Sequence, residues 1–335
     1  MRSLQSNLLA PAIQGGDRTA LARAITLVES QLTSDRRDTE ILFEQLLPVK
    51  GDSVRIGVTG VPGAGKSTLI EQLGIQALGM GYKVAVLTVD PSSQQSGGSI
   101  LADKTRMTRL AGHPQAFVRP SPAGNARGGV ATRTRECIYL CEAAGFDLVF
   151  VETVGVGQVE LAVAGITDIV LLMLLPGGGD ELQKMKSGVI ESADFLLINK
   201  ADREMRDVAL STASDYQQVF RLIRRPRGND IVDVLAISAL ENQGLRDVLQ
   251  KVIHLYQKRC ESGELSSRRE DQTKAWLWQS IKETLEESIL GDLSDVGTGT
   301  MARLEKDVVD GRMTASVAAR HFIDHCLEYR FGENR

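Results

Sequence analysis

Six short hydrophobic runs in the middle of the chain alternate with segments of helical spacing. The runs are rich in Val, Ile and Leu and are apolar at almost every position, which is typical of strands buried on both faces of a parallel sheet. They cover residues 54–59, 84–90, 148–152, 169–175, 195–199 and 234–237. This pattern predicts an α/β fold with a doubly wound, mainly parallel sheet between two layers of helices.

Further helices are expected on both sides of this region. Residues 18–32 and 39–47 have helical spacing, with Asp17 placed to cap the first helix and Pro48 placed to end the second. The polar segment 261–271 has neither a strand pattern nor an apolar run, so we expect a linker there. We therefore divide the chain into an N-terminal helical extension (1–50), a central α/β domain (51–260) and a C-terminal helical arm (261–335).

The C-terminal arm is expected to contain two amphipathic helices. Leu277, Ile281, Leu285 and Ile289 recur every four residues and so share one helix face. Thr314 is placed to cap a second helix, which carries Val317, His321, Phe322 and Cys326. Two helices alone bury little apolar area, so they must dock on the central domain or on another subunit. The expected linker favours another subunit, in a homodimer.

The charge and cysteine content exclude several classes of function. Lys and Arg total 39 against 43 for Asp and Glu, without a long run of either sign, so neither nucleic acid nor an anionic membrane is an expected partner. Four scattered cysteines do not make a disulfide framework, and a reducing cytoplasm fits them best. No run approaches the roughly 18 apolar residues of a membrane span, so we expect a soluble, cytoplasmic protein.

A phosphate-binding loop follows the first expected strand and precedes a helical stretch, as this motif requires. Its glycines allow backbone N–H groups to face the β-phosphate, at a helix N-terminus that favours anions. Lys66 is expected to reach the β- and γ-phosphates, and Ser67 to bind Mg²⁺. The loop makes the central domain a P-loop NTPase, and its nucleotide-binding residues are Gly60, Val61, Pro62, Gly63, Ala64, Gly65, Lys66, Ser67 and Thr68.

A second segment indicates that the bound base is guanine. Asn199, Lys200 and Asp202 stand at the end of a buried strand, where side chains emerge beside the nucleotide. The carboxylate of Asp202 can accept hydrogen bonds from N1–H and N2–H of guanine, a pair of donors that adenine lacks. The segment Ser238, Ala239 and Leu240 follows the next strand and can support the base through a backbone amide. The expected ligands are therefore GTP and GDP.

Residues for magnesium binding and hydrolysis are expected near the γ-phosphate. Glu152 ends a strand where most GTPases have a magnesium-binding Asp, and the Gly155 amide is placed to contact the γ-phosphate. Asp90 and Asp103 could hold Mg²⁺ through water molecules. With Lys66, these four residues form the expected catalytic set. Val156 stands where many regulatory GTPases have a Gln that orients the attacking water, so we expect slow hydrolysis without a partner.

A glycine-rich loop follows the fourth expected strand. Three glycines after Pro176 begin the loop 177–186, which carries charged and amide side chains towards the nucleotide edge of the sheet. Such a loop can act as a moving element. A simple flexible connection is the alternative.

Several of these segments together resemble one family. Residues 90–93, 103–107, 152–158 and 177–186 look like the methylmalonyl-CoA mutase-associated GTPases of the MeaB/ArgK type, and the resemblance covers about residues 17–330. It implies a homodimeric G-protein chaperone that binds an adenosylcobalamin-dependent methylmalonyl-CoA mutase and gates cofactor loading, protection and reactivation. It also implies that Gln183 and Lys186 relay the nucleotide state to the partner, and that the C-terminal helices form the dimer arm.

Cobalamin is expected to bind the mutase rather than this chain, which lacks the Asp-x-His-x-x-Gly signature of cobalamin-binding domains. Two other functions are alternatives. A nickel-insertion GTPase would share the fold, but it usually carries a His-rich tract or paired Cys and His ligands, which this sequence lacks. A P-loop kinase linked to amino-acid transport would need an acceptor site and a base, and guanine specificity would be unusual for it.

Overall fold

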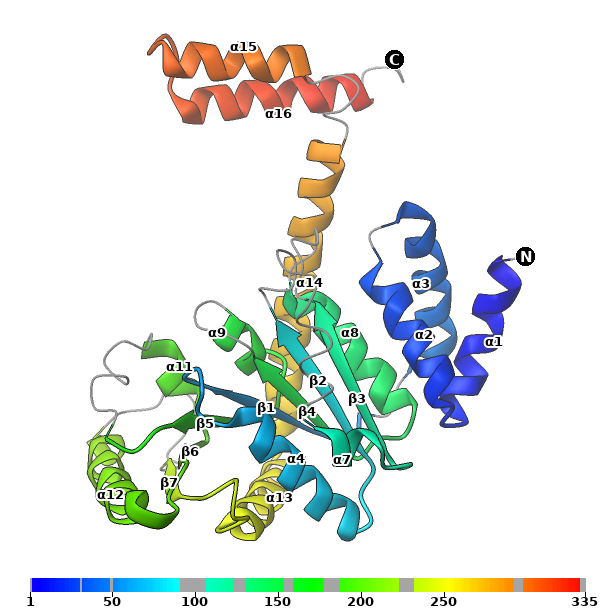
Figure 1. The fold of residues 1–335 in the computed structure, drawn as a ribbon. Coiled ribbons are helices and arrows are strands. Elements are labelled where there is room, and N and C mark those ends of the chain that lie inside the picture. The colour runs from blue at the N-terminus through cyan, green and yellow to red at the C-terminus, as the bar shows by residue number, and fades with distance from the viewer. Residues whose placement is uncertain are drawn as a thin grey trace. The chain divides into compact units, whose positions relative to one another are not determined.

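A seven-stranded sheet forms the centre of the protein (Figure 1). The computed structural model describes residues 2–30, 32–48, 51–90, 107–122, 130–153, 159–177, 187–222, 232–291 and 298–331. All neighbouring strands pair in parallel, in the order β3-β2-β4-β1-β5-β6-β7. The strands are β1 (Val54–Gly60), β2 (Val84–Asp90), β3 (Ala116–Pro122), β4 (Leu148–Thr153), β5 (Ile169–Leu174), β6 (Phe195–Ile198) and β7 (Asp233–Ala236). The predicted doubly wound α/β fold is confirmed.

Helices cover both faces of the sheet, and successive strand residues enter two separate cores. Leu148 and Phe150 of β4 join the core beneath α4, whereas Val149 and Val151 join the core beneath α8. The first core is formed with α4 (Lys66–Gly79), α7 (Thr108–Ala111), α11 (Ser187–Ser192), α12 (Arg206–Leu222) and α13 (Leu245–Glu261). The second is formed with α8 (Val130–Ala143), α9 (Val159–Ala164) and the N-terminal helices. Burial on both faces explains why the strands are apolar at nearly every position.

The N-terminal helices are α1 (Arg2–Gln14), α2 (Arg18–Glu29) and α3 (Thr33–Leu46). Asp17 caps α2 as predicted, because its Oδ1 accepts hydrogen bonds from the amides of Thr19 (2.7 Å) and Ala20 (3.2 Å). Buried side chains of α2, among them Leu21 and Ile25, share a core with α8. The N-terminal helices therefore belong to the same compact unit as the sheet.

The sequence analysis missed strand β3, which contains Pro120 and Pro122. Proline has no backbone N–H and cannot donate a hydrogen bond to a neighbouring strand. A proline within a run of residues therefore argues against a central strand. β3 lies at one edge of the sheet and pairs only with β2, where Thr88 stands opposite Pro120. An edge strand tolerates proline because one of its sides has no strand to bond to.

At the other edge of the sheet, a side chain bonds to the backbone of β7. The amide of Gln217 on α12 donates from Nε2 to the Val232 carbonyl (3.0 Å) and accepts at Oε1 from the Val234 N–H (3.0 Å). A primary amide offers the same donor and acceptor as a peptide group. The backbone groups of these two residues are thereby satisfied without a further strand.

The prediction of a linker over residues 261–271 is wrong. A single helix, α14 (Glu264–Gly291), begins within this segment, and the chain divides into two compact units after Thr273. Arg269 forms an ion pair with Asp168 (2.7 Å). The side chain of Gln272, which is buried, donates to the Thr167 carbonyl (2.9 Å). Polar residues of this region therefore bond to buried partners at Arg269 and Gln272, although most of the segment 261–271 is exposed.

Two buried carboxylates each connect an arginine, Arg269 or Arg259, to the beginning of a strand. Asp168 accepts from the amide of Arg55 in β1 (2.9 Å) as well as from Arg269. Asp194 accepts from the amide of Val170 in β5 (2.8 Å) and from the guanidinium of Arg259 (2.7 Å). Burial lowers the pKa of Arg269, but hydrogen bonding to Asp168 and the charge of this carboxylate more than offset that effect and raise the pKa above its ordinary value.

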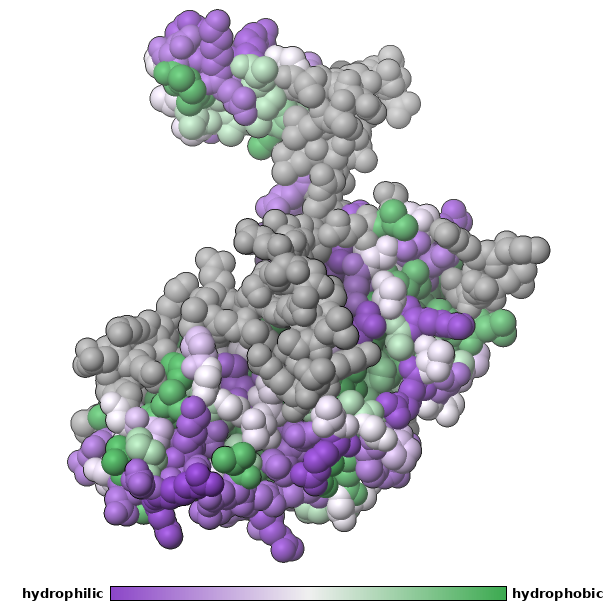
Figure 2. All heavy atoms as spheres, in the orientation of Figure 1, coloured by the Kyte–Doolittle hydropathy of each residue, from purple (hydrophilic) through white to green (hydrophobic). Residues whose placement is uncertain are grey.

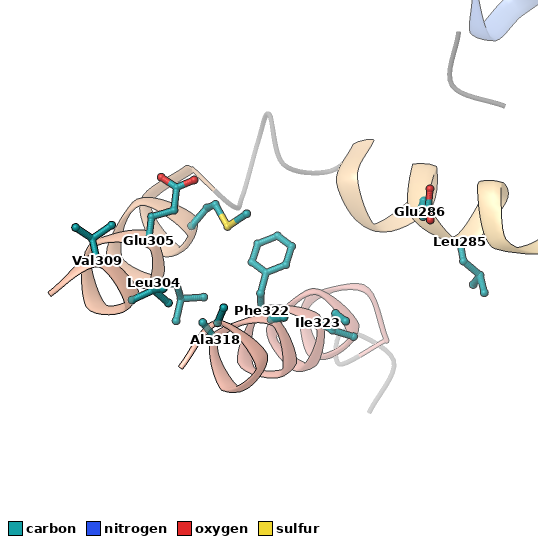
Figure 3. A pocket seen from close by; sticks show the side chains of 12 residues that line it. Leu285, Glu286, Leu304, Glu305, Val309, Ala318, Phe322 and Ile323 are labelled. Carbon is teal, nitrogen blue, oxygen red and sulfur yellow. The ribbon is translucent and has the colours of Figure 1, made fainter. Parts of the chain in front are cut away.

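The second compact unit, Lys274–Arg335, contains the rest of α14 and the helices α15 (Thr298–Val309) and α16 (Ala315–Phe331). The predicted helix after Thr314 is α16, whereas α15 was not predicted. Leu304, Ala318 and Phe322 form the small core of this unit. A cavity of about 660 Å³ is lined almost entirely by apolar side chains of the three helices (Figure 3).

Hydrophobic residues also reach the surface of this second unit. Leu277, Trp278 and Leu285 of α14 are each more than half exposed. Hydrophobic and hydrophilic residues are both visible on the surface of α15 and α16 (Figure 2). Among the residues that the structure describes, no helix has the length and hydropathy needed to cross a membrane.

We expect Arg269→Met to lower the free energy of unfolding by about 3–5 kcal/mol, because the fully buried carboxylate of Asp168 would lose its guanidinium partner. Arg312→Met is the matched control. Arg312 pairs with Asp307 and Asp310 while 56% exposed, and its loss should cost about 0–1 kcal/mol. Urea unfolding of the full chain, followed by circular dichroism, measures both values. Equal stabilities of the two variants would contradict this account.

Candidate functional site

The carboxyl ends of the parallel strands bring the predicted site residues to one edge of the sheet. The chain order reverses at β1, since β4 and β2 lie on one side of it and β5, β6 and β7 on the other. The loop after β1, the end of β4 and the segments after β6 and β7 therefore meet at this edge (Figure 1). In open α/β sheets, ligands bind at such a switch point.

The loop between β1 and α4 has the backbone shape of a phosphate cradle. Gly60, Gly63 and Gly65 all have positive φ angles (140°, 75° and 91°). A Cβ atom at Gly60 would collide with the Met173 carbonyl of β5, so only glycine fits at that position. Gly65 occupies the N-cap of α4 and no side chain caps the helix there. The first amides of α4 are thus placed to bind an anion.

Lys66 is held inside this loop. Its Nζ donates to the carbonyls of Gly60 (2.8 Å) and Val61 (3.1 Å), and the residue is buried. The ammonium group therefore lies against the loop backbone that would surround a phosphate. This position fits the predicted role of Lys66 as the phosphate-binding cation.

The predicted magnesium ligands Ser67 and Glu152 are brought together. Ser67 Oγ donates to Glu152 Oε1 at 2.6 Å, and Glu152 is only 2% exposed. A hydroxyl and a carboxylate oxygen are the hard ligands that Mg²⁺ prefers, and Mg²⁺ is usually held by one or two protein oxygens together with phosphates. Within the described parts of the chain, no group of three or more His, Cys, Asp or Glu side chains could hold a metal. The two residues fit a phosphate-linked magnesium ion.

Asn199 connects three loops of the site. Its Nδ2 donates to the Ala64 carbonyl in the phosphate-binding loop (2.6 Å), and its Oδ1 accepts from the Ala239 amide after β7 (2.9 Å). Its own amide donates to the Leu174 carbonyl at the end of β5 (3.0 Å). The side chain is buried, and both ends of its amide group have partners. This connecting role was not foreseen, because no sequence pattern shows which carbonyl lies opposite the side chain.

Asp202 is oriented by Ser238. The buried hydroxyl of Ser238 donates to Asp202 Oδ1 (2.8 Å) and accepts from the Glu241 amide (3.1 Å). This arrangement fixes one carboxylate oxygen of Asp202 and leaves Oδ2 for a ligand. Lys200, two residues earlier, has a φ of 65°, a conformation that is uncommon for a non-glycine residue and that clusters at functional sites. Leu240 is 71% exposed at the outer end of the same region.

Some predicted residues lie outside the description. Asp103, Gly155, Gln183 and Lys186 are outside the described residues, and for Asp90 only the backbone at the end of β2 is described. The structure therefore brings together the phosphate-binding loop, Glu152, Asn199, Lys200, Asp202 and the segment 238–240.

Gly65→Ala is expected to lower the affinity for GDP by about tenfold or more, because the new Cβ would lie 2.6 Å from Asn199 Nδ2 and displace its bond to Ala64. Gly81→Ala is the matched control. Gly81 has the same φ of 91°, but a Cβ there would meet no atom within 4 Å. Isothermal titration of both variants with GDP and Mg²⁺ tests the contact. Similar affinities would show that the close approach of residue 65 and Asn199 does not matter for binding.

Comparisons with known proteins show which family the chain resembles. Residues 21–293 match the family described as "Methylmalonyl Co-A mutase-associated GTPase MeaB". A "Putative GTPase" of Caulobacter vibrioides is 46% identical over 317 residues, which cover 95% of each chain. The mouse protein "Methylmalonic aciduria type A homolog, mitochondrial" is 41% identical over 280 residues, which cover 81% of this chain and 68% of that protein.

A solved structure described as "LAO/AO transport system kinase" is similar to this chain with a TM-score of 0.74 and 30% identity. The match covers 96% of this chain and 97% of that one. The sequence matches extend through the phosphate-binding loop, the base-reading segment and the helices around them. The chain therefore belongs to the MeaB family of methylmalonyl-CoA mutase-associated GTPases and is a GTP-hydrolysing P-loop protein.

Proposed function

We propose that this GTPase is a nucleotide-controlled chaperone of an adenosylcobalamin-dependent acyl-CoA mutase, methylmalonyl-CoA mutase. In this proposal, GTP binding and hydrolysis gate cofactor loading and the protection and reactivation of the mutase. The family description names this mutase as the associated enzyme, which supports the proposed partner. The structural observation that carries the proposal is the pair of hydrogen bonds made by the Asn199 side chain, one to the Ala64 carbonyl and one from the Ala239 amide. These two bonds hold the phosphate-binding loop and the segments proposed to read the base together.

The described residues support specific roles at the nucleotide. The loop amides and Lys66 would bind the phosphates, and Asp202 Oδ2 would accept from guanine. Ser67 and Glu152 would hold Mg²⁺, which neutralises phosphate charge when bound. We assign Gly155 to the γ-phosphate and Asp90 and Asp103 to the water shell of the metal. Hydrolysis would be slow in the isolated protein because Val156 cannot orient the attacking water.

We further propose that the protein acts as a cytoplasmic homodimer and that the C-terminal helices form the contact between subunits. Support comes from the apolar side chains Leu277, Trp278, Ile281 and Leu285 on α14, which are exposed in the described chain. An apolar stripe of this kind is typical of a helix that packs on a partner. Cobalamin would belong to the mutase.

Asp202→Asn should shift the preference of the site from guanine towards xanthine. The new amide can donate to the 2-oxo group that replaces the guanine amine, whereas the carboxylate cannot. We expect GDP affinity to fall by about tenfold to a hundredfold and XDP affinity to rise, since unpaired polar groups in a binding site are costly. Competition between the two nucleotides measures the change. Unchanged selectivity would mean that another segment reads the base.

Lys186→Ala should weaken mutase-stimulated hydrolysis by about tenfold while GTP affinity stays nearly constant, if Lys186 and Gln183 relay the nucleotide state. Lys184→Ala, two positions earlier in the same loop, is the control for loss of a positive charge. Release of labelled phosphate from γ-labelled GTP is measured with and without the mutase. Equal stimulation of both variants would contradict the relay.

The same assay tests a second candidate function. The solved relative described as a transport system kinase raises the possibility of phosphoryl transfer to an acceptor. A switch releases the label as free phosphate, whereas a kinase transfers it to a second molecule.

A further inference from the structure

The glycine-rich loop begins at a backbone position that a helix side chain holds. Gly177 is the first residue of the loop 177–186, the part of the loop that the structure describes, and it has a φ of 75°. Its amide donates to Oγ1 of Thr212 on α12 at 3.1 Å. Thr212 is 9% exposed, and its hydroxyl donates in turn to the Val208 carbonyl one turn earlier (2.7 Å). A Cβ on Gly177 would lie 3.9 Å from Val208 Cγ1, so Gly177 lies next to the first turn of α12.

Helix α12 follows directly from the segment that reads the base. Asp202 is followed by a short 3₁₀ turn, Arg203–Met205, and then by the first residue of α12. The Met205 amide donates to the Asp202 carbonyl (3.1 Å), so the turn is bonded to the base-reading residue. Ala209, Ala213 and Tyr216 then bury one face of α12 in the core with β6 and β7 (Figure 1). Asp202 is therefore connected to the beginning of α12 by a single hydrogen-bonded turn.

The chain just before Gly177 is also hydrogen-bonded to the segment 199–202. The Asn199 amide donates to the Leu174 carbonyl, three residues before Gly177. These contacts close a ring. Two stretches of chain, Leu174 to Gly177 and Asn199 to Thr212, are joined at their ends by two hydrogen bonds, Gly177 to Thr212 and Asn199 to Leu174. Both non-covalent links of the ring are backbone amides with a single described acceptor. Opening either link would remove one of the two hydrogen bonds that close the ring.

We propose that Thr212 is a positioning residue that couples guanine binding at Asn199 and Asp202 to the backbone at Gly177, where the chain enters the glycine-rich loop. The inference deepens the proposed switch and rests on it for the role of the loop. The hydroxyl of Thr212 bonds to Gly177 and Val208, neither of which is among the residues assigned to the nucleotide. A base bound at Asp202 restrains the ring on one side, and Thr212 carries that restraint to the root of the loop.

The coupling predicts a response to the base rather than to the phosphates. In the full chain with Mg²⁺, GDP should slow hydrogen exchange of the Gly177 amide by about threefold to tenfold, the range that corresponds to one further-stabilised hydrogen bond. Saturating pyrophosphate fills the phosphate-binding loop without a base and should leave the exchange rate nearly unchanged. Residue-resolved mass spectrometry measures the exchange, and titration confirms that each probe is bound.

Thr212→Val tests the residue, because valine has almost the same shape but no hydroxyl. Exchange of the Gly177 amide should become about tenfold faster without nucleotide, and GDP should no longer slow it, while GDP affinity changes by less than about threefold. Thr212→Ser retains the hydroxyl and should rescue both properties. Thr39→Val is the matched control, since Thr39 Oγ1 also donates to the carbonyl one turn earlier, in α3 far from the site.

The outcomes separate this inference from the proposed function. A Thr212→Val protein that binds GDP and still slows exchange at Gly177 would overturn the inference, as would a wild-type protein that binds GDP without any change there. A wild-type protein that fails to bind GDP would instead overturn the proposed function. If Thr212→Val does not fold, Thr212→Ala removes the same hydroxyl without a branched side chain. The same faster exchange at Gly177, and the same loss of the GDP effect, are then expected of Thr212→Ala.

Discussion

One buried side-chain amide, that of Asn199, holds the nucleotide site together. Its two ends bond to Ala64 and Ala239, so the loops after β1, β6 and β7 are fixed relative to one another. Each of these loops starts at the end of a strand in a single parallel sheet, which limits their relative motion further. The requirement for glycine at position 65 follows from the same contact, since the Asn199 side chain occupies the space that a larger residue would need. The phosphate-binding loop and the segments after β6 and β7 are therefore one geometric arrangement.

The strands of the fold could be predicted where burial alone determines the residue types. All six predicted strands begin and end within one residue of the observed bounds. The exceptions have physical reasons. β3 was missed because its prolines argue against a strand except at an edge, and an edge is not visible in a single sequence. The first part of α14 was taken for a linker because residues 261–271 show neither a strand pattern nor an apolar run, and the sequence does not reveal that Arg269 and the next polar residue, Gln272, bond to buried groups.

Residues for the site could be proposed from the sequence, but the contacts between them could not. Lys66, Ser67 and Asp202 were assigned because phosphate, magnesium and guanine each demand a particular chemical group at a particular spacing, and these roles stay predictions. The bond from Ser238 to Asp202 depends instead on how the segments after β6 and β7 lie side by side. The steric need for glycine at position 60 depends on the register between β1 and β5, which places Met173 opposite it. Such facts come from three-dimensional arrangement and leave no local signal.

The two edges of the sheet have a consequence for how this protein meets other molecules. On one side, proline in β3 removes backbone donors, and on the other, the amide of Gln217 occupies a donor and an acceptor of β7. Unprotected edges invite another chain to continue the sheet, in aggregation or in strand-addition complexes. Among the described strands, both borders of the sheet therefore disfavour such growth, and strand addition by another chain is not favoured at either of them.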